Sequence, residues 1–145
     1  MEERRLLRRR ALFLTFEHLL RVGIDPLAPV GGDAEVDCVV RLENGGYREA
    51  VIAVATGPSP RWFRVSRLRP RHGLVVVCMS LLGENVETWV IPSLVFAEQA
   101  ERSGGAFDLN LDSGPRAQAL EEYRDAWHYL TQGAVRSQER PEPPA

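Results

Sequence analysis

The chain has 145 residues, of which 44% are apolar, which is enough for one hydrophobic core and too little for two independent domains. Its formal net charge of −2 neither demands nor excludes a polyanionic partner, because the distribution of charge matters more than its total. No apolar stretch approaches the ~20 residues that span a bilayer, and no signal-peptide pattern opens the chain. We therefore expect a cytoplasmic protein with no membrane partner.

Residues 2–22 predict an amphipathic helix, and Gly23 follows as a stop signal. The apolar residues at helical spacing are Leu6, Leu7, Ala11, Leu14, Leu19 and Leu20. Five arginines occupy the first ten residues, at positions 4, 5, 8, 9 and 10. Such a run is either a solvated helix face or a set of phosphate contacts, and the sequence favours the solvated face.

Residues 35–41 predict a half-buried strand, because Val36, Cys38 and Val40 alternate with polar neighbours. The sequence Asn44-Gly45-Gly46 then predicts a turn, so residues 47–56 should pair back as the second strand of a hairpin. Cys38 and Cys78 both lie in apolar runs, which predicts buried, reduced thiols.

The second half of the chain alternates further strands with helices. Extended segments are expected at residues 61–66, 73–80, 87–91 and 107–111, and the unbroken apolar run in 73–80 indicates a strand covered on both faces. Helices are expected at residues 92–102 and 116–130. We expect one domain over residues 1–133 and a disordered, proline-containing tail over residues 134–145.

The hairpin places three residues where metal-dependent phosphodiester cleavage would need charged groups. A divalent ion requires carboxylates, and a strand can present an acid and a lysine two residues apart on one face. Asp37 lies on the first strand, whereas Ala53 and Ala55 share one face of the second. The spacing suits this chemistry, but two of the three side chains that it needs are missing.

In this order of residues the chain resembles the PD-(D/E)XK nuclease superfamily, particularly its small, intron-endonuclease-like branch. Asp37 matches the first acid of the motif, Val54 and Thr56 match flanking positions, and Ala53 and Ala55 stand at the acid and lysine positions. The resemblance extends over residues 10–131 and includes the strands at 74–77 and 89–93. It implies an α/β fold with a PD-(D/E)XK core, in which a mixed central sheet is flanked by helices.

The resemblance also implies a DNA endonuclease that uses Mg²⁺ or Mn²⁺, disabled here because one strand carboxylate remains and the chain contains no lysine. Glu17, on the first helix, is a second candidate metal ligand. Either a natural relative lost its activity or the acid and lysine were deliberately replaced. The coincidence of both losses on one strand favours deliberate replacement.

DNA is the expected partner of such a domain, which could work as a homodimer or in a larger complex. Arginines after the hairpin are candidate contacts to the nucleic-acid backbone, at Arg61, Arg64, Arg67, Arg69 and Arg71, although a basic connector is an equal alternative. His18, His72 and His128 lack metal-ligand spacing. The rival hypothesis is a non-catalytic module that binds nucleic acid or protein within a larger defence or mobile-element complex.

Overall fold

The computed structural model describes residues 2–29, 35–112 and 114–137. Its centre is a four-stranded sheet in the order β1-β2-β4-β5, formed by β1 (Cys38–Arg41), β2 (Tyr47–Val54), β4 (Leu74–Ser80) and β5 (Glu87–Pro92). β2 and β4 run parallel, and the other two pairs are antiparallel. This mixed central sheet, flanked by helices, confirms the predicted fold class.

The hairpin forms as the alternation and the turn residues predict. Cys38 pairs with Ala50 and Arg41 with Tyr47, and Gly45 adopts the positive φ of 91° that the turn requires. All residues of β4 are buried, as expected for a strand covered on both faces. β1 is shorter than predicted, since it begins at Cys38 and not at Glu35.

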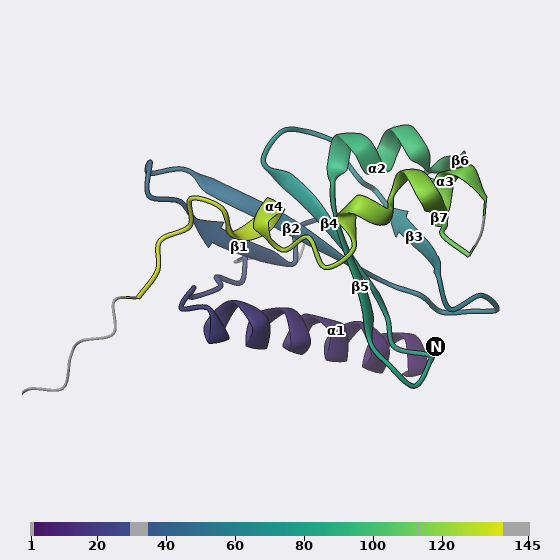
Figure 1. Ribbon diagram of the computed structural model, residues 1–145, viewed down its shortest axis with the longest axis horizontal. Helices are drawn as coiled ribbons and strands as arrows, with labels where there is room; N and C mark the ends of the chain where they lie inside the picture. The colour runs from purple at the N-terminus through teal and green to yellow at the C-terminus, as the bar shows by residue number, and fades with distance from the viewer. Residues whose placement is uncertain (1, 30–34, 113, 138–145) are drawn as a thin grey trace, which may run out of the picture.

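The two faces of the central sheet are covered differently (Figure 1). The helix α1 (Glu2–Arg21) packs on one face, against a cluster that includes Ala50, Ile52 and Val77. The other face is covered by α2 (Ser93–Gln99) and a three-stranded sheet in the order β3-β7-β6. This second sheet consists of β3 (Trp62–Ser66), β6 (Glu101–Ser103) and β7 (Ala106–Asn110).

Two predictions for the second half of the chain are wrong. The helix expected over residues 92–102 ends at Gln99, because residues 101–103 pair with β7. The closing helix is broken into α3 (Pro115–Ala119), a 3-10 turn at Glu121–Tyr123 and α4 (His128–Thr131). The break occurs where Asp125, at φ 52°, donates its amide to Thr88 of β5.

The end of the described chain returns to the hairpin. Ala134 forms a bridge with Leu42, and the amide of Val135 donates to the carbonyl of Arg41 at 2.9 Å. Most of the predicted disordered tail, residues 138–145, lies outside the described residues. No helix in the described ranges is both long and apolar enough to cross a membrane.

Candidate functional site

Asp37 lies immediately before β1, where pairing between β1 and β2 ends. One oxygen of its carboxylate accepts a hydrogen bond from the Ile52 amide at 2.7 Å, and the other accepts one from the Arg8 guanidinium of α1. The Asp37 side chain is only 11% exposed. Because β1 does not extend back past Cys38, the Asp37 carboxylate takes the place of a strand carbonyl as the acceptor for the Ile52 amide of β2. Both carboxylate oxygens of Asp37 therefore accept hydrogen bonds from the chain itself.

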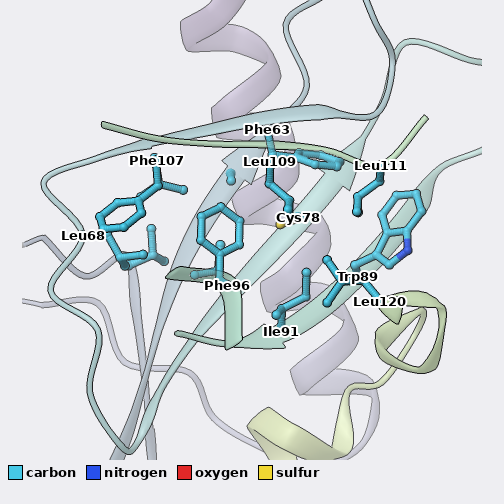
Figure 2. Packing of buried hydrophobic residues seen from close by; sticks show 14 of the residues in the cluster. Phe63, Leu68, Cys78, Trp89, Ile91, Phe96, Phe107, Leu109, Leu111 and Leu120 are labelled. Atoms are coloured by element: carbon cyan, nitrogen blue, oxygen red, sulfur yellow. The ribbon is translucent and has the colours of Figure 1, made fainter. Parts of the chain in front are cut away.

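Ala53 on β2 and Ala55, just beyond the last residue of β2, lie on the same side of the chain, as their spacing predicts, but this side is not open to solvent. They are 3% and 1% exposed and belong to an apolar cluster with Phe63, Phe96 and Phe107. Figure 2 shows the labelled side chains of this cluster converging from the two sheets and α2. The two alanines are therefore part of a packed core beneath that layer.

Glu17 is not brought to Asp37. It lies nine residues beyond Arg8 on α1, or about 13 Å along the helix axis. Its side chain is exposed and forms an ion pair with Arg21 at 2.8 Å. Asp37, by contrast, bonds to Ile52 of β2, the residue before Ala53. The structure therefore brings Asp37 and Ala53 close together, whereas Glu17 lies elsewhere on α1.

These residues do not fit a divalent metal ion. Mg²⁺ and Mn²⁺ need several oxygen ligands, whereas the Asp37 oxygens already accept from an amide and from a guanidinium whose positive charge would repel a cation. Among the described residues, no group of three His, Cys, Asp or Glu side chains could hold a metal. The sequence alone did not reveal Arg8 as the partner of Asp37, because 29 residues separate them.

Arg61, a predicted DNA contact, is held by acidic and aromatic neighbours. Its Nε and Nη2 donate to the two Glu87 oxygens at 3.1 and 2.6 Å, and Arg124 donates to the same carboxylate at 2.5 Å. Both guanidiniums also lie over the Trp89 ring, with Cζ to centroid distances of 5.6 and 5.4 Å. Arg61, just before β3, is thus linked to Glu87 of β5, and Glu87 in turn binds Arg124 from the segment after α3.

The hydrogen bond from Arg61 lowers the pKa of Glu87 below its ordinary value of 4.5. The stabilisation from a depressed carboxylate pKa is present above about pH 4.5 and is lost as the pH falls through the folded-state value. Glu87→Gln should therefore lower the free energy of unfolding by about 2 kcal/mol at pH 7. The difference from wild type should shrink as the pH falls below about 4.5.

Thermal unfolding of wild type and Glu87→Gln, at pH 7 and at several pH values below about 4.5, measures this difference in stability. Glu84→Gln, which changes an exposed glutamate in the loop before β5, is the matched control and should be nearly neutral. A constant difference between wild type and Glu87→Gln at every pH would contradict the role assigned to the Glu87 charge.

The other predicted arginines differ in how firmly they are held. Arg71 donates to Glu49 through Nε and Nη2 at 3.2 and 2.9 Å, and its backbone is bound by the Ser93 hydroxyl. Arg64 approaches Asp108 at 3.9 Å with a largely exposed side chain. Arg71 is thus fixed in a structural contact, whereas Arg64 remains accessible from solvent.

Arg67 and Arg69 lie on the exposed loop after β3, next to the Asp37 region. Arg69 is 3.4 Å from Glu35, and both arginines line a small cavity with Glu35 and Val36. Arg67 has a φ of 61°, an uncommon conformation for a residue with a side chain. Because Arg8 contacts Asp37 on the other side, residues 35–37 connect this loop to the arginine-rich half of α1.

The two cysteines provide no nucleophile for chemistry here. Both are free and buried, as predicted. Burial, with the nearby Asp37 charge, raises the pKa of Cys38 to about 12, and burial raises that of Cys78 as well. Both thiols therefore stay protonated at neutral pH.

Comparison with known proteins relates this fold to an endonuclease. The structure of a bacterial homing endonuclease, I-Ssp6803I, superposes with a TM-score of 0.58 and 22% sequence identity. The match covers 89% of this chain and 92% of that chain. The chain matches no known sequence family and no curated protein. The structural superposition shows that the chain has a nuclease-like fold, similar to that of a homing endonuclease, over nearly its whole length.

Proposed function

We propose that this chain is a DNA-binding domain built on a PD-(D/E)XK nuclease fold that does not cleave DNA. The observation that carries the proposal is the state of Asp37, whose carboxylate is bound by the Ile52 amide and the Arg8 guanidinium of its own chain. The acid and lysine positions of the motif are the buried Ala53 and Ala55. An active relative would use Mg²⁺ or Mn²⁺ at these positions, and this chain lacks the ligands.

The packing around the two alanines supports natural loss of activity over deliberate replacement. A deliberate exchange of an acid and a lysine for alanine would leave space and unmatched polar surroundings. Here the neighbours of Ala53 and Ala55 are apolar side chains, including Phe63 and Phe96, and the described residues contain no buried polar side-chain atom without a partner.

DNA would bind along the edge of the fold formed by residues 35–37, the first half of α1 and the loop after β3. Arg4, Arg5 and Arg9 are exposed and form no ion pair with another described residue, and the same holds for Arg67. Guanidiniums that have no acidic partner can release counterions from the DNA backbone when they bind phosphates. The loop arginines predicted from sequence would thus act together with the arginines of α1.

The cleavage test uses supercoiled plasmid and single-stranded DNA with Mg²⁺ or Mn²⁺, and we expect no product. Fluorescence anisotropy with labelled duplex DNA should detect binding that weakens as salt rises. Cleavage that disappears in Asp37→Asn would overturn the non-catalytic half of the proposal. Absence of binding at low salt would overturn the DNA half and favour a protein-interaction module.

Removing one arginine from each side of the proposed DNA surface should reduce the salt dependence of binding. In Arg5→Ala/Arg67→Gly, the glycine also suits the positive φ at position 67. The slope of log K against log salt should fall by about 1.8, or about 0.9 for each lost phosphate contact. The matched control, Arg102→Ala/Arg116→Ala, removes the same charge at β6 and α3 and should keep the slope. Equal slopes in both variants would contradict the assigned surface.

A further inference from the structure

The outward side of α1 carries a row of exposed apolar side chains. Leu6, Phe13 and Leu20 are 64%, 66% and 60% exposed, although they are large hydrophobic residues. Seven residues separate each from the next, so they lie in one line along the helix. Ala11, Thr15 and Leu19, which face the sheet, are all fully buried on the opposite side.

This arrangement means that α1 has two apolar faces. A helix that packs on one sheet normally presents polar residues to solvent on its other side. Leu6 and Leu20 are among the apolar residues at helical spacing in the sequence, but the face that packs on the sheet is formed by Ala11, Thr15 and Leu19. Isolated exposed hydrophobics need no explanation, but a row at heptad spacing is typical of a helix seam that has a partner.

The row is symmetric about Phe13, and the two charges beside it are symmetric to within one residue. Leu6 and Leu20 lie seven residues on either side of Phe13. On one flank of the row, Arg10 lies three residues before Phe13 and Glu17 four residues after it, both exposed. If a second α1 is laid antiparallel against this row, Phe13 meets Phe13 once, at the centre, whereas the pairs of Leu6 with Leu20 and of Arg10 with Glu17 each occur twice.

We propose that this outward face of α1 is the interface of a homodimer, in which the α1 helices of two copies pack antiparallel about Phe13. A parallel pairing would place Arg10 against Arg10 and stack the two arginine-rich ends, which like charges disfavour. Antiparallel pairing separates these ends and matches opposite charges. Glu17 can join a new pair readily, because its present bond to Arg21 is between exposed side chains.

The interface would be small, so a reversible dimer is expected. From Leu6 to Leu20 the row spans about 21 Å of helix. A seam with three apolar side chains from each copy falls at the lower end of specific interfaces, roughly below 1,200 Å² of total buried area. The dimer should therefore form and dissociate over an accessible concentration range.

A charge exchange tests the pairing directly. Arg10→Glu alone would place glutamate against Glu17 of the second copy, and Glu17→Arg alone would place arginine against Arg10. Each single variant should weaken dimerisation about tenfold by sedimentation equilibrium, and the double variant should restore it. Both positions are exposed, so folding should be unaffected, which circular dichroism checks. A wild-type chain that stays monomeric, or single variants that dimerise as the wild type does, would overturn the proposal.

Introduced cysteines test the orientation. Phe13→Cys should form a disulfide-linked dimer under mild oxidation, without competition from Cys38 and Cys78, both fully buried. Leu6→Cys alone should not crosslink, because antiparallel copies hold these positions about 21 Å apart, beyond the ~7 Å limit between Cα atoms. A mixture of Leu6→Cys and Leu20→Cys chains should crosslink. Efficient crosslinking of Leu6→Cys by itself would overturn the antiparallel arrangement.

The dimerisation measurements need no DNA. The variants used in them leave unchanged every arginine that the DNA-binding variants replace. Failure of the dimer proposal would therefore leave the proposed function untouched.

Discussion

Ala53→Glu combined with Ala55→Lys is expected to unfold or severely destabilise the domain and to produce no nuclease activity. Both alanines are nearly inaccessible to solvent and are packed in the cluster that contains Phe63, Phe96 and Phe107. The new side chains would need space that the core does not have and would bring two ionisable groups into apolar surroundings. Each substitution should lower the free energy of unfolding by about 4 kcal/mol or more.

Chemical unfolding of the single and double variants measures this loss, because a domain of this size has only about 5–15 kcal/mol of stability. Thr56→Lys is the matched control, since it places the same charge on the next, exposed residue and should be nearly neutral. A double variant that folds with wild-type stability and cleaves DNA in Mg²⁺ would contradict the proposal. It would instead indicate a nuclease whose active strand had been disabled.

Asp37→Ala should destabilise the domain, and for a structural reason. It would remove the acceptor of the Ile52 amide and leave Arg8 without its partner. A part-buried donor without a partner costs about 1–3 kcal/mol, so we expect a loss near 3 kcal/mol. Asp37→Asn keeps a carbonyl oxygen for Ile52 and should lose only about 1 kcal/mol.

Unfolding with and without Mg²⁺ or Mn²⁺ separates this role from metal binding. Because the Asp37 carboxylate is bound by the Ile52 amide and Arg8, neither ion should raise the unfolding midpoint of the wild type more than that of Asp37→Asn. Arg8→Ala is the companion variant and should lose less stability than Asp37→Ala, since the Arg8 side chain is about half exposed. A metal-dependent rise in the wild type that vanishes in Asp37→Asn would show that Asp37 is a metal ligand.

The local elements of this protein follow from its sequence because short-range physics fixes them. Alternation of apolar and polar residues, with glycines at the turn, predicts the β1-β2 hairpin, and the unbroken apolar run predicts the doubly covered β4. Period two also places Ala53 and Ala55, the residue just beyond the end of β2, on one side of the chain. The fold class, a mixed central sheet flanked by helices, came from the family resemblance that these residues carry, and the structure confirms it.

Contacts between distant residues were decided only by the tertiary structure. The face of Ala53 and Ala55 is closed because Phe63, Phe96 and Phe107 arrive from three other elements. The closing helix breaks because β5 offers the Thr88 carbonyl to Asp125, a bond that outweighs helical propensity. Asp37 meets Arg8 because α1 packs against β2, where Asp37 also accepts from the Ile52 amide. Sequence spacing fixes which side chains share a face, but burial and pairing depend on what packs against it.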